Sequence, residues 1–220
     1  MDELNALNRQ LAFVRAFYFT GSPPFEALMR KYLPQYSPLG EPTSDEFECW
    51  QEARKGLEVL GQFSLSLVEK AVHDYLRECV RCEGMHHGLK KRGKESWFDC
   101  YCRYLEENTS FRWPNSPVTR DRIEQINLCR NDFIHDDGID SGQPKKSEHH
   151  AKRHPVSPFD DDLDRAVRLA VTQVNGEAPG NDPGSLTVDR HALIIAVADA
   201  GKFCAFVEKH RTKPGDDQHR

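Results

Sequence analysis

The sequence predicts a mainly α-helical protein, a bundle of about four to five helices with one long loop. Several segments repeat apolar residues every three or four positions, which is the spacing of one helix face. Gly- and Pro-rich stretches separate these segments. The 220 residues, 38% of them hydrophobic and 30% charged, suffice for one globular domain. We expect a single domain over residues 1–210, with its core at about 45–210, and a polar tail over 211–220.

The first predicted helix covers residues 3–19, where Leu, Val and Tyr recur at helical spacing. Residues 21–24, Gly-Ser-Pro-Pro, predict its end, because proline lacks an amide hydrogen and clashes with the preceding turn. Further prolines up to position 42 indicate a mostly irregular connection, with a short helical turn near residues 25–32.

A second, longer helix is expected to begin at Thr43 or Ser44, residue types that cap helix N-termini. Its pattern continues to about residue 82, with Gly56 and Gly61 as points where it bends or divides. The apolar positions cover a wide arc of this helix, which is typical of a central helix with several neighbours.

The next two predicted helices run from about 96 to 107, and from a Thr119 cap to about His135. Residues 136–158 are rich in Gly and Pro and contain almost no apolar residues, so we expect a long, flexible loop.

The region before the last helix allows two interpretations. Residues 160–172 fit a helix, whereas their second half alternates like a strand. We prefer a small β-hairpin that pairs residues 169–174 with 185–188. Asp189 is then expected to cap a final helix that ends at about Lys209.

Charge and hydropathy exclude some classes of protein. The net charge of −5 argues against a general nucleic-acid coat protein, although it permits a local basic patch. The acidic start, Met-Asp-Glu, does not resemble a secretory signal, and the longest apolar run, 192–198, is too short to cross a bilayer. We therefore expect a cytoplasmic protein that has no contact with membranes.

The seven cysteines raise the question of a metal site. Cys79, Cys82, His86 and His87 offer four candidate ligands for zinc, but the two cysteines fall within a helical pattern. The Cys-x-Cys spacing at 100–102 is also poor for a structural zinc site. Ordinary buried, reduced thiols are the preferred interpretation.

Polar residues interrupt the apolar end of the fourth predicted helix. On an ideal helix Arg130 falls within the buried stripe, while Asn131 and His135 lie together on one flank. Arg130 and His135 are then about 140° apart, so one straight helix does not direct both at one phosphate. Either the helix unwinds near 136–138, or a second copy of the chain completes the site across a two-fold axis.

Simpler interpretations exist for both residues. Arg130 suits an interior arginine paired with a carboxylate, and Glu69, at the edge of the second helix's apolar arc, is a candidate partner. His135 suits a C-terminal helix residue favoured by the helix dipole.

Residues 129–136, Cys-Arg-Asn-Asp-Phe-Ile-His-Asp, resemble the signature of the HEPN superfamily of all-α proteins. That motif is Arg, four to six residues, then His, most often with Asn, Asp or His directly after the Arg. Arg130, Asn131 and His135 match it. The segments 65–71 and 193–206 are similar to an earlier and a final helix of HEPN chains, so the resemblance spans about 45–210.

The resemblance implies a metal-independent RNA endonuclease that needs no cofactor, forms a homodimer with both motifs facing one cleft, and acts as a toxin or in phage defence. It implies that His135 is the general acid or base and that Arg130 stabilises the transition state. Asn131 would orient His135 or donate to the phosphate. Asp132 and Glu69 are candidate supporting residues, Glu69 as the carboxylate partner of Arg130. The expected product carries a 2′,3′-cyclic phosphate.

One position departs from the pattern. Some HEPN toxins are silenced by a partner enzyme that modifies a Tyr two residues after the motif His, and this chain has Asp137 there. We therefore do not expect this control, although another antitoxin or defence partner is consistent with the resemblance. The expected RNA-binding residues form one basic cluster: Lys90, Lys91, Arg92 and Lys94. The second cluster, with three histidines nearby, is interpreted as solvated loop charge: Lys145, Lys146, Lys152 and Arg153.

Overall fold

The computed structural model describes residues 2–32, 44–82, 89–93, 95–135, 152 and 188–211. Within these ranges the protein is helical and contains no strand, which confirms the predicted fold class. None of the described helices combines the length and apolar character that crossing a membrane requires. The elements are α1 (Asp2–Lys31), α2 (Ser44–Cys82), α3 (Trp97–Asn108), the 3-10 turn η1 (Trp113–Asn115), α4 (Arg120–His135) and α8 (Arg190–His210).

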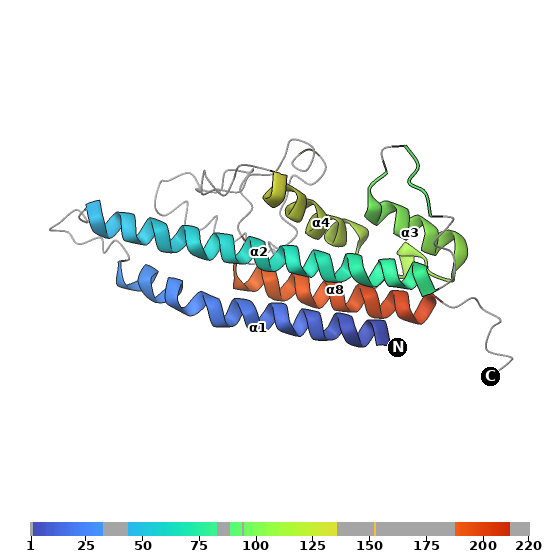
Figure 1. Cartoon of the computed structure of the whole chain (residues 1–220), viewed down its shortest axis with the longest axis horizontal. Coiled ribbons are helices and arrows are strands. Elements are labelled where there is room, and N and C mark those ends of the chain that lie inside the picture. The colour runs from blue at the N-terminus through green and yellow to red at the C-terminus, as the bar shows by residue number, and fades with distance from the viewer. Residues whose placement is uncertain are drawn as a thin grey trace.

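The long helix α2 is the centre of the bundle. Helices α1, α2 and α8 lie side by side along the long axis of the molecule, and all three pack on one another (Figure 1). Helices α3 and α4 also pack on α2, on the side opposite α1 in this view (Figure 1). The expectation of a central helix with several neighbours is confirmed, because α2 contacts every other α-helix of the described part.

The predicted end of the first helix at residues 21–24 is wrong. Helix α1 continues through Pro23 and Pro24 to Lys31 and absorbs the short turn expected near 25–32. Two internal prolines cost about 3 kcal/mol or more each in an isolated helix. Packing against α2 offsets this cost, because Ser22 is buried and Phe25 lies directly against Gly56 of α2.

The two glycines of α2 do not divide it. Instead each one permits a close approach, since a Cβ atom at Gly56 would lie 2.3 Å from the Phe25 ring. At Gly61 a Cβ would lie 2.0 Å from the carbonyl oxygen of Val188, just before α8. A hydrogen atom is thus required at both positions for α1 and the start of α8 to reach α2.

The remaining helices agree with the predicted bounds to within a residue or two. Ser96 caps α3, its Oγ accepting from the Asp99 amide, and Asp189 caps α8, its carboxylate accepting from the Ala192 amide. Val188 is non-helical, and the rest of the predicted β-hairpin lies outside the described residues, as do most of the tail and the predicted loop 136–158 apart from residue 152.

An aromatic cluster anchors the segment between α3 and α4. Trp113 stacks on Phe203 of α8, with ring centroids 5.1 Å apart, and Phe111 packs edge-on against both rings. In the first turn of α4, Arg122 forms an ion pair of 2.7 Å with Asp199 of α8. These contacts fix the start of α4 relative to the core.

The close approach at Gly61 leads to a test of the fold. We expect Gly61→Ala to destabilise the protein by about 1–3 kcal/mol, because overpacking against a backbone carbonyl outweighs the gain in helix propensity. Gly201→Ala is the matched control, since its Cβ would meet Leu11 at an ordinary 3.7 Å. That variant should be neutral or more stable by up to about 1 kcal/mol. Urea unfolding measures both, and equal stabilisation by the two substitutions would contradict the described contact.

Candidate functional site

A polar groove lies where α2, α3 and α4 meet, on the opposite side of α2 from α1. Its volume is about 630 Å³. We call it the α2–α3–α4 groove, and the described residues that line it are Ser66, Leu67, Glu69, Lys70, His73, Asp74, Arg77, Lys91, Ser96, Trp97, Asn127, Arg130 and Asn131. Among them four side chains are cationic and two are acidic, in a chain whose overall net charge is −5. The groove is therefore a positive site on an acidic protein.

The α4 wall of the groove is a closed set of polar contacts. Arg130 Nε lies 3.7 Å from Glu69 Oε2, and Arg130 Nη1 donates to Asn131 Oδ1 at 3.0 Å. Asn131 donates to Asn127 at 3.3 Å, and Asn127 donates in turn to Glu69 Oε1 at 3.3 Å. Arg130, Asn131 and Glu69, which the sequence singled out, thus meet in one place.

Arg130 differs from its predicted position. The helical wheel places it within the apolar stripe, where Ile123, Ile126 and Cys129 are indeed buried. Its side chain is nevertheless 37% exposed. A long arginine stem lets the guanidinium reach the edge of the core while its methylene groups stay against apolar neighbours. The cation is therefore accessible from the groove.

The other residues of the motif are placed less directly. Asp132 is buried and is not among the residues that line the groove, so it does not share the groove surface with Arg130. His135 is the last residue of α4, and its side chain lies outside the part of the chain that the structure describes.

Glu69 is more deeply buried than its partner Arg130. Its carboxylate is 13% exposed, and burial raises its pKa, while Arg130 opposes that rise. A separation of 3.7 Å is too long for a direct hydrogen bond, so Arg130 keeps donors available for another acceptor. An anion that enters the groove meets a guanidinium whose carboxylate partner holds it loosely.

His73 is a groove residue that the sequence analysis did not select. It lies one helical turn after Glu69, and its Nε2 is 3.5 Å from the Tyr101 hydroxyl. Its Nδ1 is 3.8 Å from Asp74 Oδ1. Burial lowers the pKa of His73, with Asp74 acting in the opposite direction. Burial therefore favours the neutral imidazole, which is the form that accepts a proton.

A signal for this part of the site was present in the sequence. The polar side of the second predicted helix carries Glu69, Lys70 and His73, and these three line the groove with Asp74 and Arg77. Asp74 pairs with both Lys70 and Arg77, the latter at 3.2 Å. A polar strip on an otherwise apolar central helix is the feature that indicates a site there.

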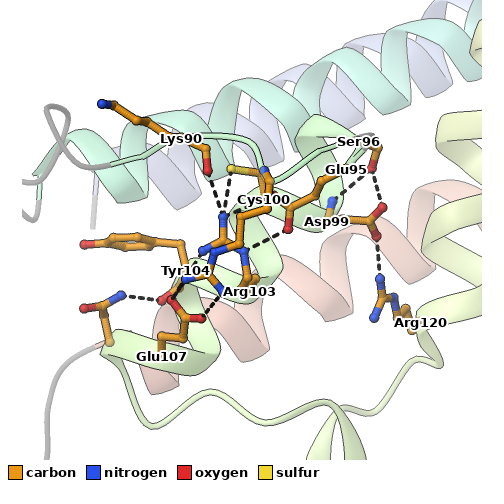
Figure 2. Close-up of polar contacts among 11 residues, drawn as sticks. Lys90, Glu95, Ser96, Asp99, Cys100, Arg103, Tyr104, Glu107 and Arg120 are labelled. Atoms are coloured by element: carbon orange, nitrogen blue, oxygen red, sulfur yellow. Dashed lines mark hydrogen bonds and ion pairs between the residues drawn. The ribbon is translucent and has the colours of Figure 1, made fainter.

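The α3 wall is held by the network that surrounds Arg103 (Figure 2). Arg103 donates to both carboxylate oxygens of Glu95, at 2.8 and 3.1 Å, and to the carbonyl oxygen of Lys90 at 3.0 Å. This pairing lowers the pKa of Glu95 to about 2. The neighbouring Ser96 cap bonds to Asp99, which pairs with Arg120 of α4 (Figure 2). The network thus fixes residues on both sides of Lys91 and joins α3 to α4.

The predicted RNA-binding cluster is divided by the structure. Lys91 lines the groove, and its ammonium lies over the Trp97 ring. Arg92 instead pairs with Glu107 at 3.1 Å. Lys90 contributes its carbonyl oxygen to Arg103 and does not line the groove, and Lys94 lies outside the described residues.

The cysteines that the structure describes are free thiols. Five are buried, namely Cys79, Cys100, Cys102, Cys129 and Cys204, and Cys49 is half-buried. Within the described ranges no group of three or more His, Cys, Asp or Glu side chains has the arrangement of a metal site. The side chains of Cys82, His86 and His87 lie outside those ranges.

Comparison of the chain with protein-family models, with curated proteins and with solved structures found no match. The groove and the motif in α4 are therefore the features of the molecule that indicate its function.

The environment of His73 leads to a prediction about its titration. We expect an imidazole pKa below 6.5. Asp74→Asn should lower this pKa further, because it removes the negative charge that stabilises the protonated imidazole. Arg77→Gln should raise it, because it removes a nearby cation. An NMR titration, with the resonances assigned by His73→Gln, measures all three. Shifts of the same sign in the two variants would contradict the described surroundings.

The Arg103 network leads to a second prediction. Arg103→Met should destabilise the protein by about 1–2 kcal/mol at neutral pH, because it breaks several charge-assisted hydrogen bonds. Glu95 has a native pKa of about 2, against an ordinary 4.5, so its contribution is complete above pH 4.5 and is lost as the pH falls towards 2. The difference in free energy of unfolding between wild type and Arg103→Met should therefore decrease as the pH falls from 4.5 towards 2.

Urea unfolding at neutral pH and at about pH 3 measures this difference. Arg54→Met is the control, since Arg54 forms an exposed ion pair with Glu58 one turn along α2. That pair should contribute less than about 1 kcal/mol. An Arg103→Met effect no larger than that of the control would show that the network does not hold the α3 wall.

Proposed function

We propose that this protein is a metal-independent endoribonuclease of HEPN type, and that the α2–α3–α4 groove holds the RNA backbone. The observation that carries the proposal is the position of Arg130 and Asn131, the first two residues of the HEPN-like motif. They lie on the wall of a groove whose lining carries more cationic than acidic side chains. A guanidinium in such a groove suits a phosphodiester, because its planar fork matches two phosphate oxygens.

The proposed reaction needs only side-chain chemistry. A neutral imidazole removes the proton of the ribose 2′-hydroxyl, and the 2′-oxygen attacks the adjacent phosphorus. The bond from phosphorus to the 5′-oxygen breaks, and that oxygen takes a proton from an acid. The products are a 2′,3′-cyclic phosphate and a 5′-hydroxyl. Arg130 stabilises the charge that develops on the phosphoryl oxygens.

Two histidines are candidates for the proton transfers. The resemblance gives this role to His135 at the end of α4, with Asn131 one turn before it. His73 of α2 lines the groove and has a lowered pKa, which suits the role of base. In the homodimer that we propose, a second copy brings its own motif to the same cleft. We also propose that the enzyme acts in the cytoplasm as a toxin or in phage defence.

The proposal predicts that the purified protein cuts single-stranded RNA in excess EDTA and leaves 2′,3′-cyclic phosphate ends. His135→Ala and Arg130→Met should each reduce the rate at least about 100-fold, because each removes a group that acts in the transition state. Gel electrophoresis of a labelled RNA measures the rate, and susceptibility of the ends to a cyclic phosphodiesterase identifies the product.

Matched controls for this assay are His191→Ala and Arg54→Met, which change the same residue types outside the groove. Both should cut RNA at the wild-type rate. Undiminished cutting by His135→Ala would remove that residue from the mechanism. Cutting that stops in EDTA would refute metal independence.

The ion pair between Glu69 and Arg130 favours a second candidate function. A pair that joins α2 to α4 at 3.7 Å also suits a non-catalytic helical module, in which the motif supports a dimer interface or binds a nucleotide or partner. This alternative predicts no cleavage, and a change in oligomeric mass when Arg130 is replaced. Light scattering of wild type and Arg130→Ala distinguishes it from the nuclease, whose Arg130 variant loses activity at unchanged mass.

A further inference from the structure

An exposed tryptophan forms the α3 side of the groove. Trp97 is 49% exposed, although large aromatic side chains are normally covered in a folded protein. Its ring stacks on Tyr101 at a centroid distance of 6.1 Å and an interplanar angle of 28°. Tyr101 in turn packs edge-on against His73 at 5.5 Å. The three rings thus run from His73 on α2 through Tyr101 to the exposed Trp97 on α3.

Among the described residues, the flexible Lys91 side chain lies over the Trp97 ring. The Lys91 ammonium lies 5.2 Å from the ring centroid, and the rest of the Lys91 side chain is exposed. A cation over an indole at such a site contributes only about 0.5–1 kcal/mol. A planar ligand therefore displaces Lys91 at small cost, and the ammonium remains close enough to pair with an anionic group of that ligand.

Cations also line the α2 and α4 sides of the groove. Arg77 and Lys70 of α2 and Arg130 of α4 line the groove together with Trp97. An exposed aromatic ring beside a row of cations is the arrangement that binds unpaired nucleotides, because the base stacks on the ring while the phosphates meet the cations. A duplex does not offer a base face to such a ring, since its bases are stacked on one another.

We propose that Trp97 is a base-stacking subsite, and that the groove therefore selects single-stranded over double-stranded nucleic acid. This inference rests on the proposed function for the identity of the ligand, and it adds the residue that binds the base and the form of RNA that is bound. Lys91 is the residue that pairs with a phosphate next to the stacked base.

The test measures binding rather than cleavage. The probe is a fluorescently labelled 2′-O-methyl RNA strand of mixed sequence, which has no free 2′-hydroxyl and is not cut by the proposed reaction. Anisotropy gives its affinity at one fixed, low salt concentration, because phosphate contacts depend strongly on salt. The same strand annealed to its complement is the duplex probe.

We expect Trp97→Ala to weaken binding of the single strand about 10-fold or more, and Trp97→Phe to retain most of the affinity, because its ring still stacks. Phe47→Ala is the control, since Phe47 is 42% exposed and stacks on Trp50 outside the groove. It should bind like wild type. The duplex should bind more weakly than the strand, with an affinity that Trp97→Ala does not change.

Each result bears on one proposal. Unchanged single-strand binding by a folded Trp97→Ala variant, verified by circular dichroism, would overturn the subsite, as would equal wild-type affinity for strand and duplex. Binding that depends on Trp97 in a protein that does not cut RNA would leave the subsite standing and remove the nuclease. Cutting of RNA by a protein whose single-strand binding does not depend on Trp97 would overturn the subsite and leave the nuclease standing.

Discussion

The contact between Glu69 and Arg130 is the interaction on which the candidate site depends. It joins the central helix to α4 at the boundary between core and groove, and it determines where the guanidinium points. One turn before Arg130, Asn127 connects the same carboxylate to Asn131. Fully buried ion pairs bring little net stability, because desolvation cancels most of the attraction. An arginine held at this boundary is instead oriented while it remains accessible.

The length of α2 makes this placement possible. A continuous helix from Ser44 to Cys82 packs against α1 and α8 on its apolar sides and still offers one polar strip to the groove. Its packing against α1 and the start of α8 depends on two glycines, which let the Phe25 ring and the Val188 carbonyl approach closely. The α3 wall is fixed separately, through Arg103 and the Asp99–Arg120 pair. Different contacts therefore hold the two sides of the groove: Glu69 of α2 holds α4, and the Arg103 network and the Asp99–Arg120 pair hold α3.

Periodicity and capping residues were sufficient to predict the helical class and the positions of α2, α3, α4 and α8, because these features act locally. The end of α1 was mispredicted, since the cost of Pro23 and Pro24 is offset by packing on α2, which no local pattern contains. Within the site, the motif and a polar position on α2 identified Arg130, Asn131 and Glu69. Trp97 was missed, because it becomes a groove residue only when α3 packs beside α4.

The acidic residues of the groove bear on what it binds. Asp74 and Glu69 already neutralise part of the charge of Lys70, Arg77 and Arg130, so a simple anion gains little by entering. A ligand must add a second source of affinity to compete with these carboxylates. In the binding mode that we propose, a nucleic acid strand does so, because a base stacks on Trp97 while phosphates of the strand meet Lys91 and Arg130. The pairing of exposed Trp97 with a loosely held guanidinium therefore favours a nucleic acid strand over a free phosphate.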